Sequence, residues 1–142
     1  MANKDTLTIK VNALAANESF LRSTVGAYAA RINPTIETVS DLKTAISEAV
    51  TNSIVHGYDC DPEGIITVNC DIVDGVLNVE IRDNGKGIDD VEKAMSDFYT
   101  TKGEDERSGL GFTIMKSFMD TLEVISAPGE GTTVKMSKKL TA

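Results

Sequence analysis

The sequence predicts an α+β fold of two layers, in which helices cover one face of a mostly antiparallel, mixed sheet. The first observation is a hairpin, because residues 66–72 and 77–81 alternate apolar and polar side chains on either side of Asp74-Gly75. The second is that two segments with helical periodicity precede this hairpin, while another hairpin closes the chain. Doubly wound nucleotide-binding folds alternate strands and helices throughout, and this chain does not.

The first part of the chain predicts one strand and two helices. Residues 6–12 alternate as a half-buried strand. Asn17 is placed to cap a helix over residues 18–32, which Asn33-Pro34 would end. A longer helix over residues 35–57 follows, and it ends at a glycine because glycine accepts the left-handed conformation found after many helices.

The second part predicts the elements that follow the first hairpin. They are a short helix at 91–98, a mobile polar loop at 100–109, a helix beginning at 110, and strands at 122–126 and 132–140. Because the chain shows no repeat, linker or low-complexity segment, we expect a single domain over residues 1–142.

Composition narrows the functional class. The chain has 22 acidic and 14 basic side chains and a net charge of −8, whereas nucleic-acid binding needs a cationic surface, so we expect no direct nucleic-acid partner. No apolar run approaches the roughly 20 residues that span a bilayer, and the first residues have no signal-peptide core. Cys60, Cys70 and the single histidine are too few for a structural zinc site, so we expect two free thiols in a cytoplasmic protein.

One pair of polar residues could carry chemistry in the longer helix. Glu48 and Asn52 lie four residues apart and therefore project from one face. A carboxylate can accept a proton, and an amide oxygen can bind a hard cation such as Mg²⁺. The spacing alone favours a solvated polar face, so both interpretations stay open at this point.

A glycine motif follows the second strand of the first hairpin. In Asp83-x-Gly85-x-Gly87 the glycines let the backbone approach a flat ligand, and the carboxylate can accept a hydrogen bond from an exocyclic amine. A turn capped by an aspartate explains the same residues equally well.

A second glycine motif, Ser108-Gly109-Leu110-Gly111, lies just before the last predicted helix. Exposed N–H groups at a helix start favour an anion, and Lys102 and Arg107 add positive charge nearby. An ordinary loop before a helix is the alternative. The Walker pattern is absent, so a phosphate site here would not be a P-loop.

In combination, these motifs and Gly131-Thr132-Thr133 resemble the N, G1, G2 and G3 boxes of one ATPase superfamily. That superfamily contains gyrase, Hsp90, histidine kinases and the mismatch-repair ATPases, which are together called GHKL ATPases. The four boxes occur in the right order, and the resemblance covers nearly the whole chain. It implies the two-layer sandwich known as the Bergerat fold, with ATP and Mg²⁺ as cofactors.

A closer resemblance is to the sporulation anti-sigma F factors, which are protein serine kinases. The segments that carry it are Asn17-Glu18-Ser19-Phe20, Ser47-Glu48-Ala49-Val50-Thr51-Asn52, His56-Gly57-Tyr58, and residues 107–115. By this resemblance, Glu48 is the general base that deprotonates a serine hydroxyl, and Arg107 lies near the γ-phosphate. Asn52 would bind Mg²⁺ and the phosphates, and Asp83 would accept the adenine amine. The other expected nucleotide contacts are Gly85, Gly87, Thr100, Thr101, Lys102, Ser108, Gly109, Gly111 and Thr132.

The resemblance also implies protein partners. An anti-sigma F factor inhibits a sigma factor and phosphorylates an anti-anti-sigma protein on serine, and it acts as a homodimer. Arg22 would contact both partners, although the residue alone is typical of a solvated arginine. The alternatives are a related stress-response anti-sigma kinase, a non-catalytic nucleotide-gated binding module, and the catalytic domain of a histidine kinase. The last is disfavoured because the only histidine, His56, lies inside the nucleotide box.

Overall fold

The computed structural model describes residues 5–95 and 106–141, with the side chains of 106–110 outside the description. Its sheet has five strands in the order β1-β2-β3-β5-β4. These strands are β1 (Thr6–Asn12), β2 (Ile65–Val73), β3 (Val76–Asp83), β4 (Thr121–Ser126) and β5 (Thr132–Lys139). The helices are α1 (Ala15–Ala30), α2 (Ile36–Asn52), the π-helical turn η1 (Ser53–Gly57), α3 (Val91–Ala94) and α4 (Glu106–Phe118).

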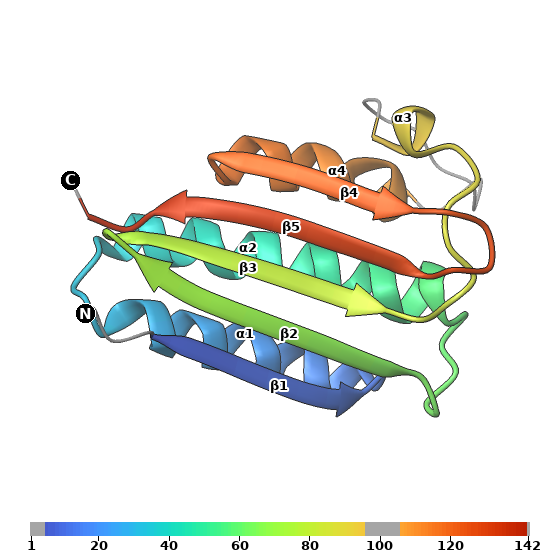
Figure 1. The fold of residues 1–142 in the computed structure, drawn as a ribbon, viewed down its shortest axis with the longest axis horizontal. Helices are drawn as coiled ribbons and strands as arrows, with labels where there is room; N and C mark the ends of the chain where they lie inside the picture. Colours follow the sequence, from blue (N-terminus) through green and yellow to red (C-terminus); the bar gives the residue numbers. More distant parts are fainter. Residues whose placement is uncertain (1–4, 96–105, 142) are drawn as a thin grey trace.

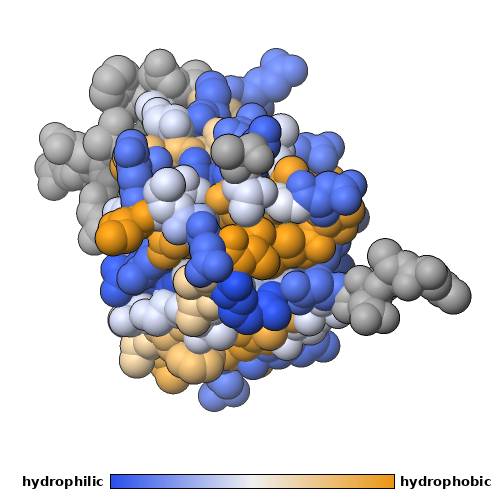
Figure 2. Space-filling model, turned by 90° about the vertical axis from the view of Figure 1, so that its left-hand side faces the viewer, coloured by the Kyte–Doolittle hydropathy of each residue, from blue (hydrophilic) through white to orange (hydrophobic). Residues whose placement is uncertain are grey.

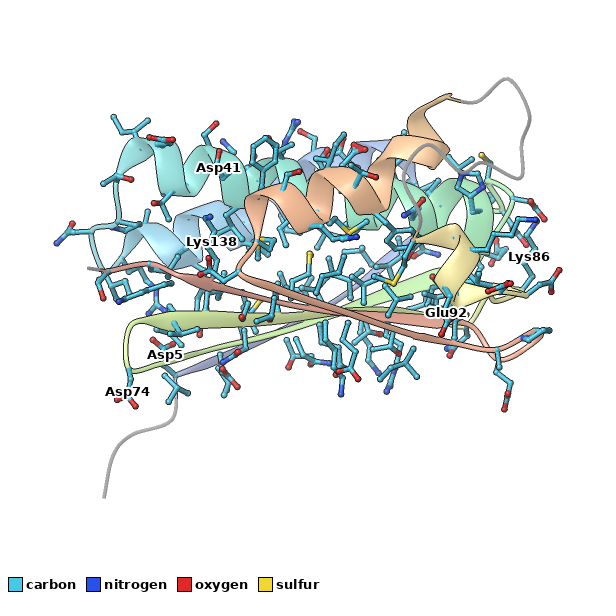
Figure 3. All side chains as sticks on the ribbon, turned by 90° about the horizontal axis from the view of Figure 1, so that it is seen from above. Asp5, Asp41, Asp74, Lys86, Glu92 and Lys138 are labelled. Atoms are coloured by element: carbon cyan, nitrogen blue, oxygen red, sulfur yellow. The ribbon has the colours of Figure 1, made fainter. Side chains whose placement is uncertain are left out.

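The elements form the two layers that the sequence predicts. Helices α1, α2 and α4 lie side by side on one face of the sheet, and the other face carries outward-pointing side chains (Figures 1 and 3). Each neighbouring strand pair within the described residues is antiparallel. The α+β prediction is therefore confirmed, and the sheet is antiparallel rather than mixed.

The core lies between the two layers. Alternate residues of β2, β3 and β5 face the helices, while α2 contributes neighbours at helical spacing. The largest fully buried side chains are Leu21, Leu42, Ile46, Ile66, Leu77, Ile81, Met115, Val25, Val50, Val68 and Val134. Complete burial of such a side chain contributes about 1.5–3 kcal/mol, so this layer holds α2 firmly over the central strands.

The β2–β3 turn forms as predicted. Asp74 and Gly75 both adopt left-handed backbone angles, with φ of 52° and 79°. Two consecutive left-handed residues match the right-handed twist of the strands they join, so the turn sets the register of the hairpin. Figure 2 views the end of the molecule that contains this turn, where hydrophilic and apolar atoms are mixed.

The start of α1 differs from the prediction. The helix begins at Ala15 after Leu14, and the amide of Asn17 donates to the carbonyl oxygen of Asn12 at 2.8 Å instead of capping the helix. The Asn17 side chain therefore bonds to the backbone that precedes the helix and does not cap the helix itself. The helix also ends earlier, at Ala30, before Asn33 turns the chain with a φ of 58°.

The end of the second helix also differs. Thr35 caps α2, because its hydroxyl oxygen accepts from the Thr38 N–H at 3.1 Å. The last turn is π-helical, and the left-handed residues are Asp59 and Cys60 rather than Gly57. Instead, the Cys60 N–H donates to the carbonyl oxygen of Ile54 at 2.8 Å, and this bond closes the C-terminal end of the helix.

The segment before α4 corrects a third prediction. Residues 106–109 belong to the first turn of α4, where a loop was expected. Of the other predicted elements here, α3 covers only Val91–Ala94, and residues 96–105, including the predicted contacts Thr100, Thr101 and Lys102, lie outside the described residues.

Candidate functional site

A cavity of about 510 Å³ opens where α2 and η1 meet the end of β3. Its walls come from α2, η1, the loop after β3, α3, α4 and the start of β5, and they include Asn52, His56, Asp83, Gly87, Phe112 and Thr132. This volume lies in the usual range for sites that hold small organic ligands. Figure 3 shows labelled Lys86 at this end of the molecule, near α3.

Asp83 is the buried acid of the cavity, with 3% of its surface exposed. Its Oδ1 accepts the backbone N–H of Gly85 at 2.9 Å and that of Thr132 at 3.2 Å. Burial raises the pKa of Asp83, while hydrogen bonds from the Gly85 N–H, the Ser53 hydroxyl and the Thr132 N–H oppose this rise. The bonds therefore hold a carboxylate acceptor in one orientation on the cavity wall.

The loop after β3 depends on its glycines for two different reasons. A Cβ at Gly85 would overlap the carbonyl oxygen of Gly57, so this position needs the space that a missing side chain leaves. Gly87 has a φ of 78°, and a Cβ there would also overlap the carbonyl oxygen of Ala127. The motif thus lets the loop lie directly against its neighbours.

Backbone bonds fasten this loop on both sides. The Lys86 N–H donates to the carbonyl oxygen of Gly57 at 2.9 Å, and the Lys86 carbonyl accepts from the Gly129 N–H at 2.6 Å. On the far side the Ile88 N–H donates to the Ser126 hydroxyl oxygen at 2.8 Å. The loop is therefore held between η1 and the β4–β5 turn, which keeps the cavity open.

Asn52 faces the same cavity from α2. Its Nδ2 atom is buried and has no hydrogen-bond partner within the described structure. Gly111 of α4 lies so close that a Cβ there would be 3.3 Å from this nitrogen. A buried amide without a partner costs free energy, which suits a group that waits for a ligand.

Glu48 is not among the residues that line this cavity. It is half-buried, and it lines a separate groove of about 750 Å³ between α1 and α2, together with Arg22. Arg22 lies 3.7 Å from the Glu18 carboxylate and donates to the Ser19 hydroxyl at 3.3 Å. The structure thus brings Asn52 and Asp83 to one cavity and places Glu48 one helical turn away on another surface.

The glycines of the second motif lie inside α4 rather than before it. Gly109 and Gly111 are the fourth and sixth residues of the helix. The N–H groups of the first turn of a helix have no carbonyl acceptor one turn earlier, whereas the Gly111 N–H lies beyond that turn and could reach a phosphate only if the first turns of α4 open. Arg107 and Ser108 belong to the first turn, where only the backbone is described.

Several residues of the site were not predicted from the sequence. Ser53, His56, Lys86 and Phe112 line the cavity, and Ser126 braces it from outside. His56 follows Asn52 at four residues, so the helical spacing that selected Asn52 could also have selected His56, whereas Ser53, the next residue, is not on that face by spacing. The contact between the hydroxyls of Ser126 and Thr132, 2.9 Å apart, has no local signal in the sequence.

Comparison with known proteins identifies the family. A family model described as a histidine kinase-like ATPase domain matches residues 11–138. An anti-sigma F factor of Caldanaerobacter subterraneus subsp. tengcongensis is 51% identical over 97% of this chain and 96% of its own length. That of Halalkalibacterium halodurans is 49% identical over 97% of this chain and 94% of its own. The chain belongs to the anti-sigma F factors.

Solved structures agree with this anti-sigma F factor in fold. The RsbU and RsbW domains of Rv1364c from Mycobacterium tuberculosis match with a TM-score of 0.69 at 22% identity, covering 95% of this chain and 32% of that one. A blue-light activated histidine kinase domain from Erythrobacter litoralis matches with a TM-score of 0.58 at 21% identity, covering 99% and 70%. The ATPase family implies that the anti-sigma F factor binds a nucleotide. Its described helices include none that is long and apolar enough to cross a membrane.

Proposed function

We propose that this anti-sigma F factor binds and inhibits a sporulation sigma factor and phosphorylates an anti-anti-sigma protein on serine, using ATP and Mg²⁺. The observation that carries the proposal is that Asn52 and Asp83 reach one glycine-walled cavity from different layers. The names of relatives about 50% identical supply the sigma factor as partner. We further propose that the protein is a cytoplasmic homodimer, as its resemblance to other anti-sigma F factors implies.

Asp83 is the residue proposed to recognise the base. Its Oδ1 already accepts from two backbone N–H groups, so the carboxylate keeps one orientation and can accept from the exocyclic amine of adenine. Gly87 and Thr132 line the same wall, where backbone and hydroxyl groups can complete the recognition. Gly85 and Gly87 let this loop pack closely against Gly57 and Ala127, which sets the position of the wall that the base would contact.

Asn52 is proposed to serve the phosphates. Its oxygen is the type of ligand that Mg²⁺ prefers, and its buried, unpartnered Nδ2 can donate to a phosphate oxygen. The side chain of Asn52 therefore fits both Mg²⁺ and a phosphate group. When bound, Mg²⁺ neutralises charge that develops on the phosphates during transfer. Lys102, Arg107, Ser108, Gly109 and Gly111 are proposed to contact the phosphates.

Glu48 is proposed as the general base. A serine hydroxyl is a weak nucleophile, so a carboxylate within hydrogen-bond reach takes its proton as the oxygen attacks the γ-phosphorus and ADP leaves. Glu48 lines the α1–α2 groove with Arg22, the proposed partner contact. Asn52, proposed to hold the phosphates, lies one helical turn from Glu48, so the partner would approach over α1 and α2 and its serine would meet the γ-phosphate between these two residues.

One observation favours a second function. Because Glu48 lies outside the cavity lining, a nucleotide-gated binding module without transfer chemistry would use the same pocket. Incubation with γ-labelled ATP and a purified anti-anti-sigma protein separates the two functions. Label on a serine of the partner supports the kinase, and normal sigma-factor binding without any transfer supports the binding module. A stress-response partner that is phosphorylated in preference to the sporulation partner would reassign the pathway.

A further inference from the structure

The hydroxyl of Tyr58 joins η1 to the start of β2 and to the loop after β3. Tyr58 directly follows η1, and its Oη donates to the carbonyl oxygen of Ile65, at the start of β2, at 2.6 Å. The same Oη accepts the backbone N–H of Asn84 at 2.7 Å. A phenolic hydroxyl has one hydrogen to donate, so these two short bonds fix the rotation of its O–H bond.

The ring of Tyr58 is fixed as well. Gly64 lies against it so closely that a Cβ on the glycine would overlap the ring. The Tyr58 N–H donates to the Ser53 carbonyl oxygen at 3.0 Å, which ties the residue to the first residue of η1. Tyr58 is thus a rigid strut between η1 and the two strand ends, and Figure 1 shows these ends meeting at one end of the sheet.

Asn84 is the link between this strut and the base-binding acid. It directly follows Asp83, and its own side chain is exposed. The next residue, Gly85, donates its N–H to Asp83 Oδ1 at 2.9 Å. A shift of the Asn84 backbone therefore moves the Asp83 backbone on one side and a hydrogen-bond donor to the Asp83 carboxylate on the other.

We propose that Tyr58 is a positioning residue for base recognition, whose hydroxyl sets the orientation of the Asp83 carboxylate through the Asn84 N–H. The inference rests on the proposed function, because it assigns a base to the Asp83 wall. Tyr58 is not among the residues that line the cavity, so it acts through Asp83 and does not touch the nucleotide.

This arrangement predicts a selective effect on nucleotides. ATP presents an exocyclic amine to Asp83, whereas inosine triphosphate has at that position a carbonyl oxygen, which is not a donor. Loss of the Tyr58 hydroxyl therefore weakens ATP binding and leaves inosine triphosphate binding unchanged. The ratio of the two affinities isolates the orientation of Asp83 from the general stability of the protein.

The test compares Tyr58→Phe with Tyr28→Phe by isothermal titration calorimetry, using the full chain, Mg²⁺ and each nucleotide. Tyr28 provides a matched control, because its hydroxyl oxygen lies 2.8 Å from both the carboxylate and the backbone carbonyl oxygen of Asp5, and its one hydrogen can be donated to either. Asp5 and Lys86 lie at opposite ends of the molecule in Figure 3. We expect Tyr58→Phe to weaken ATP binding about tenfold, the value of one or two net hydrogen bonds, and Tyr28→Phe to leave it unchanged.

The phosphotransfer assay adds a second readout. Tyr58→Phe should raise the KM for ATP and leave kcat at saturating ATP unchanged, since the reacting groups are not disturbed. Equal losses for both nucleotides, or ATP binding identical to that of the wild type, would overturn the inference. A wild-type protein that binds neither nucleotide would overturn the proposed function instead.

A measurement on the wild-type protein removes dependence on how the variants fold. The Asn84 N–H belongs to an exposed residue, yet its bond to Tyr58 should slow its exchange with deuterium. Slow exchange of this amide in nucleotide-free protein supports the strut. Exchange at the rate of an unprotected loop amide overturns it.

Discussion

The Thr132 N–H donates to Asp83 Oδ1 at 3.2 Å, and this bond joins residues 49 positions apart in the sequence. It connects the end of β3 to the start of β5, which is its neighbour in the sheet. The acid of the candidate site is therefore held by the sheet itself. A group held this way needs little rearrangement when a ligand binds, which favours affinity.

Asp83→Asn tests the acceptor role directly. The asparagine can keep the bonds to the Gly85 and Thr132 N–H groups through its carbonyl oxygen, but it loses the charged acceptor for the adenine amine. We expect ATP binding to weaken by about 10- to 100-fold, because hydrogen bonds to charged groups are worth about 1.5–3 kcal/mol. Titration calorimetry measures the change. Asp71→Asn, on the outer face of β2, is the control and should bind ATP normally.

The pKa of Asp83 predicts how ATP binding depends on pH. Burial raises this pKa, and the ionised carboxylate accepts from the adenine amine more strongly than the protonated acid does. ATP affinity should therefore fall as the pH is lowered through the raised pKa, at a higher pH than an ordinary aspartate would give. The test is calorimetry over a pH series, and an Asp83→Asn protein that keeps the same acid-side loss would contradict the assignment.

The effect of Asp83 on stability has the opposite sign. A raised pKa in the folded state means that folding favours the protonated acid. The stabilisation is fully present below the unfolded-state pKa and is lost as the pH rises through the folded-state value. In nucleotide-free protein, Asp83→Asn should thus flatten this part of the stability profile, measured by urea unfolding at several pH values.

Gly85→Ala and Gly129→Ala separate lack of space from backbone strain. A Cβ at Gly85 would overlap the Gly57 carbonyl oxygen, whereas Gly129 has open space but a φ of 76°. We expect Gly85→Ala to cost about 1–3 kcal/mol of unfolding free energy through overpacking and to weaken ATP binding. Gly129→Ala should cost about 1 kcal/mol through strain alone. Urea unfolding checks both values, and equal ATP affinities in the two variants would argue against a tight fit at Gly85.

Much of the fold follows from local patterns, and the differences arise where a local pattern allows more than one hydrogen-bonding arrangement. The β2–β3 turn was predictable because an Asp-Gly pair readily adopts the left-handed backbone angles that Asp74 and Gly75 have in this turn. Asn17 was assigned to the wrong role because the carbonyl oxygen of Asn12 competes for its amide. The π-helical turn at η1 escaped prediction because buried residues alone do not separate it from an α-helix.

The site was predictable in part for the same reason. Asp83 follows a strand and precedes glycines, so the sequence predicts both its place and its character. The position of Glu48 depends on how α1 packs on α2, and a spacing of four residues does not contain this information. Ser126 holds the loop because its hydroxyl oxygen accepts the Ile88 N–H. These two residues lie 38 positions apart in the sequence, so no local pattern predicts the bond.

Glu48→Gln tests the base. Because Glu48 lies outside the cavity lining, the variant should bind ATP like the wild type. Transfer to the anti-anti-sigma protein should fall by roughly 10²- to 10⁴-fold, the usual contribution of a general base. Glu123→Gln, at an exposed position of β4, is the control for the loss of one charge. Transfer at the wild-type rate by a folded Glu48→Gln protein would rule out this role.

The most direct test of nucleotide binding between α2 and β3 is a crystal structure with Mg²⁺ and a non-hydrolysable ATP analogue. We predict the adenine amine within hydrogen-bond distance of the Asp83 carboxylate, and the phosphates beside Asn52. An analogue bound on another surface, with the space between Asn52 and Asp83 filled by water, would contradict the account.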